Sequence, residues 1–135
     1  EKDGVPVANR PQAGKRPLSS MAPPIVYDAR GQPEFAGGAA GGKTIIMQVA
    51  KAIVAHFDWG LPAREAIGEG LVYFNDDGLI VEQGTGREPM KAALEKLGHM
   101  VIVGRLGLKA NAAEKTADGW VGAADPRSVG TALKQ

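Results

Sequence analysis

The sequence predicts a mixed α/β fold (α+β in character), in which sheets and helices pack as layers. Two observations predict it: short strand-like segments occur at both ends of the chain, and stretches with helical spacing of apolar residues lie between them. A third is composition, since 19 Gly and 9 Pro among 135 residues make up about a fifth of the chain, against an average near 12 %. Strands, then helices, then strands again are typical of a layered domain rich in turns.

Length and charge narrow the function classes further. A chain of 135 residues predicts one domain, 1–135, that is large enough to bury a core. With 16 Lys+Arg against 15 Asp+Glu, no nucleic-acid partner and no polybasic membrane surface is expected. The longest mostly apolar stretch, 44–57, is shorter than the roughly 20 residues of a membrane span. The absence of Cys excludes disulfides, thiolate catalysis and Cys-ligated metals.

The N-terminal part is expected to contain a loop and a hairpin. Residues 1–15 are predicted to be a loop, because Pro and Gly recur there without strand alternation or a helix cap. Strands are predicted over 22–27 and 33–37, joined by a turn over 28–31. The glycine run 37–42 is predicted to lie outside regular structure.

The middle of the chain predicts two helices. The first covers 45–57 and ends before Gly60, which suits a left-handed cap. Its predicted core-facing stripe consists of Ile45, Ile46, Val49, Ala50, Ile53, Val54 and Phe57. A shorter helix is expected over 62–67, with Pro62 in the first turn, where a missing N–H costs nothing.

The C-terminal half predicts further strands around one helix. That helix is expected over 87–97, with Gly98 as its stop. The turn 75–78 and the pair Asp118-Gly119 are typical of hairpins. The predicted strands are 71–74, 79–82, 100–103, 108–115 and 120–123.

The glycine run carries the first candidate site. Residues 37–44 match G-x-x-x-x-G-K-[ST], the phosphate-binding P-loop pattern, with Lys43 for phosphate and Thr44 for magnesium. However, the preceding segment 32–36 is polar and contains a Pro, whereas the strand before a P-loop lies in a buried parallel sheet. A nucleotide-binding module is therefore kept as an alternative.

The same backbone chemistry also suits a different anion. Gly41 and Gly42 stand at a helix start, where two amide N–H groups would stabilise a developing oxyanion, each by roughly 3–4 kcal/mol. A third interpretation is a tight turn that binds nothing. The loop by itself leaves these three interpretations open.

Three segments together resemble the γ-glutamyltranspeptidase (glutathione hydrolase) family. Residues 15–23, Lys-Arg-Pro-Leu-Ser-Ser-Met-Ala-Pro, resemble its K-R-P-L-S-S-M-S-P segment. The loop ending in Gly41-Gly42 stands where the family has G-S-P-G-G-S, and residues 120–127 resemble its G-A-S-D-P-R segment near the C-terminus. The resemblance extends over 16–127 and is most specific in the first segment.

The resemblance implies a fold and a reaction. The chain resembles the C-terminal part of the small subunit of an N-terminal-nucleophile hydrolase, whose αββα sandwich has mostly antiparallel sheets flanked by helices. In this family the precursor cleaves itself, and the new N-terminal Thr attacks the γ-glutamyl carbonyl, with its own α-amine as base. The acyl group then passes to water or to an amino acid. No cofactor and no metal are implied.

The resemblance assigns roles to four residues of this chain. Ser19 and Ser20 match the serine pair that binds the α-carboxylate of the glutamyl group, and Gly41 and Gly42 match the pair whose amides form the oxyanion hole. These amides are then expected to make no hydrogen bond within the protein and to lie near the serines. The nucleophilic Thr matches nothing here and is expected upstream of Glu1, so the chain is expected to be an inactive fragment on its own.

Partners and location follow from the same resemblance. The expected partners are the large subunit, the N-terminal part of the small subunit and a γ-glutamyl small molecule. The fragment is expected to self-associate through exposed apolar surface, and the protein is expected in the periplasm or secreted.

Some residues depart from the family pattern. Ala39 and Ala40 replace Ser-Pro, Lys43 replaces Ser, and residues 70–74, Gly-Leu-Val-Tyr-Phe, stand where the family often has P-R-F-H-H. A relative with altered specificity, of the glutaryl or β-lactam acylase type, is therefore a further alternative. Asp125 to Arg127 are expected to form a turn or salt bridge.

Overall fold

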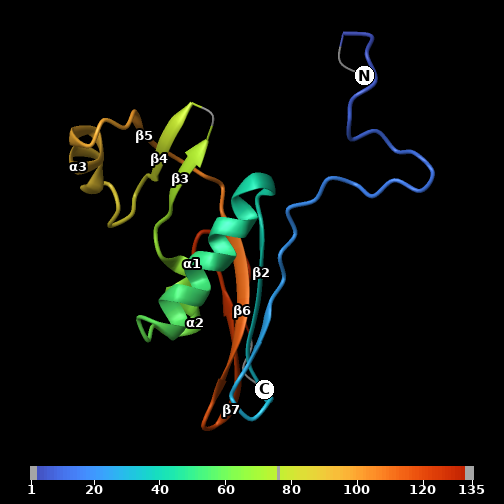
Figure 1. The fold of residues 1–135 in the computed structure, drawn as a ribbon. Coiled ribbons are helices and arrows are strands. Elements are labelled where there is room, and N and C mark those ends of the chain that lie inside the picture. Colours follow the sequence, from blue (N-terminus) through green and yellow to red (C-terminus); the bar gives the residue numbers. More distant parts are fainter. Residues whose placement is uncertain (1–2, 76, 133–135) are drawn as a thin grey trace.

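The computed structural model describes residues 3–75 and 77–132, and Figure 1 shows their arrangement. Residues 3–24 precede the first strand of the sheets. In chain order the elements are β1 (Ile25–Tyr27), β2 (Pro33–Ala40), the 3₁₀ turn η1 (Gly42–Thr44), α1 (Ile45–Phe57), α2 (Ala63–Gly68), β3 (Val72–Asn75), β4 (Gly78–Glu82), α3 (Met90–Lys96), β5 (Val101–Gly104), β6 (Lys109–Thr116) and β7 (Gly119–Ala124).

The strands form two sheets. The larger has the order β1-β2-β6-β7 and is antiparallel throughout, and α1 and α2 pack against it. The smaller has the order β3-β4-β5, with β4 and β5 parallel and joined through α3. In Figure 1 the smaller sheet and α3 stand apart from the larger sheet. We call residues 72–104 the small lobe and the larger sheet with α1 and α2 the large lobe. The predicted mixed α/β fold with mostly antiparallel sheets flanked by helices is confirmed.

The core of the large lobe lies between the two helices and the sheet. It is built mainly from small side chains around one aromatic ring: Phe35, Ala52, Ala63, Ile67, Ala110, Ala112 and Ala123. Small residues on facing elements let backbones approach closely, so a few side chains fill the layer. Phe35 is 1 % exposed and contacts the His56 ring at a centroid distance of 5.0 Å.

The predicted core stripe of α1 was wrong in part. The helix buries Ile45, Gln48, Ala52 and Ala55, whereas Ile46 is 54 % exposed and Val54 39 %. The sheet beneath the helix is rich in Gly and Ala, so the helix lies close to it and mainly small side chains such as Ala52 and Ala55 fit between them. Ile45 is buried at the start of the helix, whereas Ile46 and Val54 lie on its exposed side.

The glycine run was also placed wrongly. Gly37 to Ala40 belong to β2, and they pair in register with residues 109–112 of β6. The spacing pattern missed this because pairing with a neighbouring strand overrides the weak strand preference of Gly. A Cβ on Gly37 would lie 3.0 Å from the Phe35 ring, so the missing side chain makes room for the core aromatic.

Element ends elsewhere differ from the predictions by a few residues. The first strand begins at Ile25 rather than residue 22, and α3 begins at Met90 rather than residue 87, because residues 87–89 form a turn. Gly60 has φ +71°, the predicted left-handed conformation. The predicted turn 75–78 includes Asp76, which lies outside the described residues. No described helix has the length and apolar character that a membrane span requires.

The packing of Phe35 gives a test of this core. Replacing Phe35 with Ala is expected to lower the free energy of unfolding by about 3–5 kcal/mol, because a buried ring is lost and a cavity remains. Urea denaturation followed by circular dichroism measures the change. The matched control is Phe74→Ala, at a ring that is 67 % exposed; equal losses at both positions would contradict this description of the core.

Candidate functional site

The loop between β2 and α1 has a conformation that only glycine adopts readily. Gly41 has φ +138° and Gly42 has φ +61°, both in the region that L side chains avoid. The two carbonyl groups face the helix: Gly41 O accepts from Thr44 Oγ1 at 3.1 Å, and Gly42 O accepts from the N–H of Ile45. In the part of the chain that the structure describes, neither glycine N–H donates a hydrogen bond. Both residues are exposed, so these two donors are available to a ligand.

Beneath the loop, two buried polar side chains hold it in place. Thr44 is 8 % exposed and Gln48 is 2 % exposed. Gln48 Nε2 donates to Ala40 O at 2.9 Å and to Thr44 Oγ1 at 3.1 Å. The Thr44 hydroxyl is thus occupied within the protein, which does not suit the magnesium ligand of a P-loop. Moreover, β2 is antiparallel to both of its neighbours, whereas the strand before a P-loop belongs to a parallel sheet.

The predicted serines precede β1, the strand that begins at the end of the sheet where β2 ends. Ser19 is exposed and Ser20 half-buried, and the chain continues from them into β1. Gly37 N donates to Pro24 O at 3.1 Å, so the antiparallel pairing of β1 and β2 extends one residue before β1. The chain before β1 and the chain after β2 leave this pair at the same end (Figure 1). Among the described residues, no hydrogen bond joins Ser19 or Ser20 to Gly41 or Gly42.

A buried ionic cluster lies where the two lobes meet. Arg127 contacts Asp125 Oδ1 at 2.8 Å from the end of β7 and Glu82 Oε2 at 2.9 Å from β4. The side chains of Asp125 and Glu82 are almost fully buried. Each carboxylate also accepts a backbone amide at 3.0 Å, from Ala110 and Leu71 respectively. Although burial works against it, the pKa of Arg127 is raised, because these carboxylates hydrogen-bond its guanidinium.

Lys51 of α1 adds a second cation to this cluster. Its Nζ donates to Ile67 O at 2.9 Å and to Glu69 O at 2.6 Å, at the end of α2. Carbonyl groups at a helix C-terminus attract cations. Burial, helped by the charge of Arg127, lowers the pKa of Lys51 to about 8. Of this cluster, the sequence predicted only the salt bridge between Asp125 and Arg127, which is confirmed. Lys51 and Glu82 lie far from these residues in the sequence, and no motif connects them.

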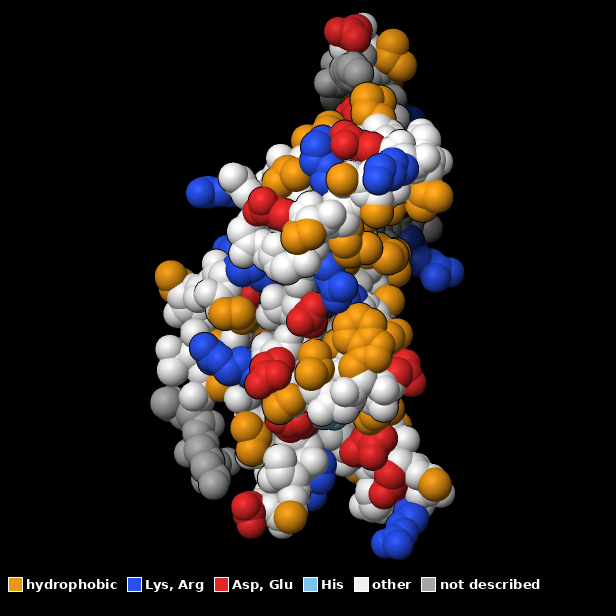
Figure 2. All heavy atoms as spheres, turned by 90° about the vertical axis from the view of Figure 1, so that its left-hand side faces the viewer, with side chains coloured by type: hydrophobic (Ala, Val, Ile, Leu, Met, Phe, Trp, Pro, Cys, Tyr) orange, Lys and Arg blue, Asp and Glu red, His pale blue; other side chains and the backbone are white. Residues whose placement is uncertain are grey.

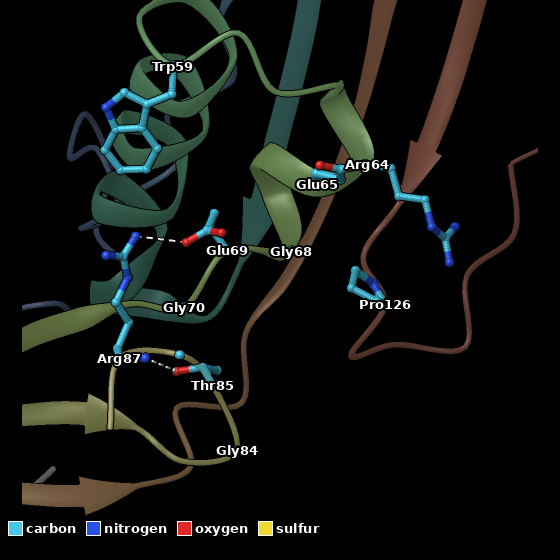
Figure 3. Close-up of a pocket in the computed structure, with 11 residues that line it drawn as sticks. Trp59, Arg64, Glu65, Gly68, Glu69, Gly70, Gly84, Thr85, Arg87 and Pro126 are labelled. Atoms are coloured by element: carbon cyan, nitrogen blue, oxygen red, sulfur yellow. Dashed lines mark hydrogen bonds and ion pairs between the residues drawn. The ribbon is translucent and has the colours of Figure 1, made fainter. Parts of the chain in front are cut away.

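A large groove runs between the lobes beside this cluster (Figure 3). Its volume is about 970 Å³. It is lined by Trp59, Arg64, Glu65, Gly68, Glu69, Gly70, Gly84, Thr85, Gly86, Arg87 and Pro126. Arg87 crosses it, forming an ion pair with Glu69 at 2.7 Å and lying 5.7 Å from the centre of the Trp59 ring. None of the four site residues predicted from the sequence lines this groove.

Comparisons with known proteins agree on one family. The family model for gamma-glutamyltranspeptidase matches residues 1–134. A glutathione hydrolase proenzyme of Escherichia coli (strain K12) is 35 % identical over 125 residues, which are 90 % of this chain and 21 % of that protein. A glutathione hydrolase proenzyme of Bacillus subtilis (strain 168) is 34 % identical over 99 residues, 72 % of this chain and 16 % of that protein.

A solved gamma-glutamyltranspeptidase structure also aligns with the chain. The T380A mutant of Helicobacter pylori gamma-glutamyltranspeptidase aligns with a TM-score of 0.77 and 29 % identity, over 92 % of this chain and 69 % of that chain. The chain therefore spans about a fifth or less of the curated relatives above, and most of a chain of the solved structure.

The ionic cluster makes a strong prediction about Arg127. In Arg127→Met, two buried carboxylates lose their counter-ion, and the free energy of unfolding is expected to fall by about 3–5 kcal/mol. Arg87→Met is the matched control, because its ion pair with Glu69 is 30 % and 35 % exposed and such pairs contribute about 0–1 kcal/mol. Urea denaturation of both variants measures the difference. A loss at Arg127 no larger than at Arg87 would refute the description of a buried cluster.

The lowered pKa of Lys51 should make the stability of the folded chain depend on pH. Its pKa is about 8 in the folded chain against the usual 10.5, so between these values the unfolded chain binds more protons. The contribution of Lys51 to the free energy of unfolding should therefore rise with pH from about 8 to about 10.5. Below about pH 8 the buried lysine is charged in the folded chain, and its destabilising effect is complete. Unfolding free energies of wild type and Lys51→Met, compared across this range, measure the effect. A constant difference between the two proteins would show that Lys51 titrates normally.

Proposed function

Because the chain belongs to the γ-glutamyltranspeptidase family, we propose that the protein containing it cleaves γ-glutamyl amides and transfers the acyl group to water or to an amino acid. The observation that carries the proposal is the pair of amides at Gly41 and Gly42, which make no hydrogen bond among the described residues. They follow β2, and Ser19 and Ser20 precede β1, which begins beside the end of β2 in this antiparallel pair.

The two amides would act on the carbonyl oxygen of the scissile bond. When a nucleophile adds to the γ-carbonyl, its oxygen becomes an oxyanion, and fixed N–H donors stabilise that charge more than the neutral carbonyl of the substrate. Gly41 and Gly42 supply such donors from a loop whose carbonyl groups are already bound on the opposite side. This arrangement favours the transition state over the bound substrate.

The two serines would hold the other end of the glutamyl group. Ser19 Oγ accepts a hydrogen bond from Met21 N at 3.1 Å, which leaves its hydroxyl hydrogen to donate to a carboxylate. Ser20 is half-buried, so a contact that it makes with a ligand is partly shielded from water. Together they would bind the α-carboxylate and fix the distance from it to the γ-carbonyl.

The nucleophile is proposed to lie outside this chain. By the family resemblance it is the N-terminal Thr of a small subunit produced by self-cleavage, with its α-amine as base, and the relatives above are named proenzymes. The large subunit and the N-terminal part of the small subunit would complete the site, so the chain alone would be inactive. A periplasmic or secreted location is proposed on the same ground.

The surface of the chain is consistent with further partners. Figure 2 shows hydrophobic side chains at the surface among acidic and basic ones. Exposed apolar residues of the large lobe include Ile25, Tyr27, Ile46, Met47 and Trp120. We propose that the rest of the precursor covers such residues and that the isolated chain self-associates through them.

Substrate preference distinguishes the proposed reaction from the acylase alternative. In the full-length protein, a γ-glutamyl anilide should be cleaved faster than a glutaryl anilide. The glutaryl compound has the same free carboxylate but lacks the α-amino group. The reverse order would favour the acylase alternative.

A titration with ATP tests the nucleotide-binding alternative. Magnesium-dependent binding of ATP that is lost in Lys43→Ala would favour it.

The serine pair is tested by substitution. Ser20→Ala and Ser19→Ala should each raise KM for the γ-glutamyl anilide by roughly 10- to 100-fold, because a hydrogen bond to a charged group contributes about 1.5–3 kcal/mol. Ser128→Ala is the matched control, since Ser128 Oγ donates to Asp125 O at 3.2 Å and accepts from Gly130 N, and it bonds to none of the four predicted site residues. Steady-state kinetics of the full-length protein gives the answer, and an unchanged KM in both serine variants would contradict the assigned role.

A further inference from the structure

Gln48 is a buried amide on the side of α1 that faces the sheet. At 2 % exposure it would be costly to bury without hydrogen bonds. Its Nε2 donates to Ala40 O at 2.9 Å and to Thr44 Oγ1 at 3.1 Å, and its Oε1 accepts from Lys109 N at 3.2 Å. One side chain thus joins the last residue of β2, the start of α1 and the first residue of β6.

These hydrogen bonds determine where the loop amides point. The peptide bonds of this loop are trans, and in a planar trans peptide the C=O and the N–H point in opposite directions. Ala40 O and Gly41 N belong to one peptide unit, so the bond from Gln48 to Ala40 O directs the Gly41 N–H away from the helix. By the same logic, the bond from the Thr44 hydroxyl to Gly41 O at 3.1 Å directs the Gly42 N–H.

The glycine between these two peptide units lies directly against the pair. A Cβ on Gly41 would lie 2.5 Å from Thr44 Oγ1 and 3.0 Å from Gln48 Nε2. Real Cβ atoms do not approach so closely, so the two side chains occupy the space that any other residue at 41 would need. A shift of Gln48 or Thr44 would therefore change the loop itself.

We propose that Gln48 is a positioning residue: together with Thr44 it aims the Gly41 and Gly42 amides at the oxyanion of the γ-glutamyl transfer. The inference rests on the proposed function and deepens it, because it assigns the alignment of the oxyanion donors to a side chain that touches no substrate. Ser19 and Ser20, on a different segment, are not bonded to Gln48, and binding of the α-carboxylate does not depend on it.

The kinetic consequence is specific. Complete loss of one oxyanion donor lowers kcat by about 100- to 1,000-fold, and a misaimed donor retains part of its effect. Gln48→Met, similar in length and without hydrogen bonds, is expected to lower kcat by about 10- to 100-fold with KM changed less than about twofold. A residue that only supports the fold would change kcat, KM and stability together.

The experiment uses the full-length protein and two inhibitors. A γ-boronate analogue of glutamate becomes tetrahedral on the enzyme and tests the oxyanion donors, whereas norvaline, which has the α-amino and α-carboxyl groups but no side-chain carboxyl group, tests the carboxylate subsite. In Gln48→Met the inhibition constant of the boronate should rise in proportion to the loss of kcat, and that of norvaline should stay within about twofold. Melting temperatures of all variants report their folding.

Thr44 provides a matched pair of variants. Thr44→Val keeps the shape and removes the hydroxyl, so it should reproduce the loss of kcat and of boronate affinity. Thr44→Ser keeps the hydroxyl and should restore both to within about threefold of wild type. If Gln48→Met does not fold, this pair and Gln48→Glu, which loses the donor to Ala40 O, decide the question.

Two results would overturn the inference. One is wild-type kcat and boronate affinity in folded Gln48→Met or Thr44→Val, and the other is an equal loss of boronate and norvaline binding. Either result in an active wild-type enzyme rejects the positioning role and leaves the proposed function intact. A folded, processed wild type that neither cleaves γ-glutamyl amides nor binds the boronate would instead reject the proposed function.

Discussion

Close contact between α1 and the glycine- and alanine-rich face of the larger sheet determines the rest of the architecture. Because Gly37 and Gly38 of β2 and the alanines of β6 carry little or no side chain, the helix lies close to the sheet and buries Ala52 and Ala55. The same approach brings Gln48 within hydrogen-bonding distance of both β2 and β6. The conformation of the loop before the helix therefore depends on how the helix packs, as well as on the sequence of the loop.

In the middle of α1, at Lys51, the packing depends on charged groups, whereas near the start of the helix it depends on small side chains. Lys51 leaves the helix toward the final carbonyl groups of α2, and Arg127 reaches the same carbonyl of Ile67 from the chain after β7. Two buried carboxylates, Glu82 and Asp125, balance these cations. Since Glu82 belongs to the small lobe and Asp125 to the large one, Arg127 links the two lobes by contacting both carboxylates.

Much of this could be predicted from the sequence, although the decisive contacts could not. The later strands and the helix over 45–57 were found because hydrophobic spacing and turn residues are local signals. The buried face of α1 was not, because burial there is decided by the residues of another element, and the pattern of Ile46 and Val54 gives no sign of the sheet's small side chains. Gln48 and Lys51 look like ordinary polar positions until β6 and α2 are brought beside them. Of the site, the motifs indicated Ser19, Ser20, Gly41 and Gly42, but not the side chains beneath the loop.

The match of residues 37–44 to a phosphate-binding pattern illustrates why a string of residues does not define a site. Both interpretations need amide donors at the start of a helix, and the sequence provides them in either case. What separates them is the environment of Thr44 and the direction of the strand. A P-loop threonine must present its hydroxyl to a metal, whereas here the hydroxyl is bound between Gly41 O and Gln48 Nε2, and β2 runs antiparallel to both neighbours. The donors remain, but the side chain that would hold magnesium instead fixes the backbone, which suits an uncomplexed oxyanion better than a metal-bound phosphate.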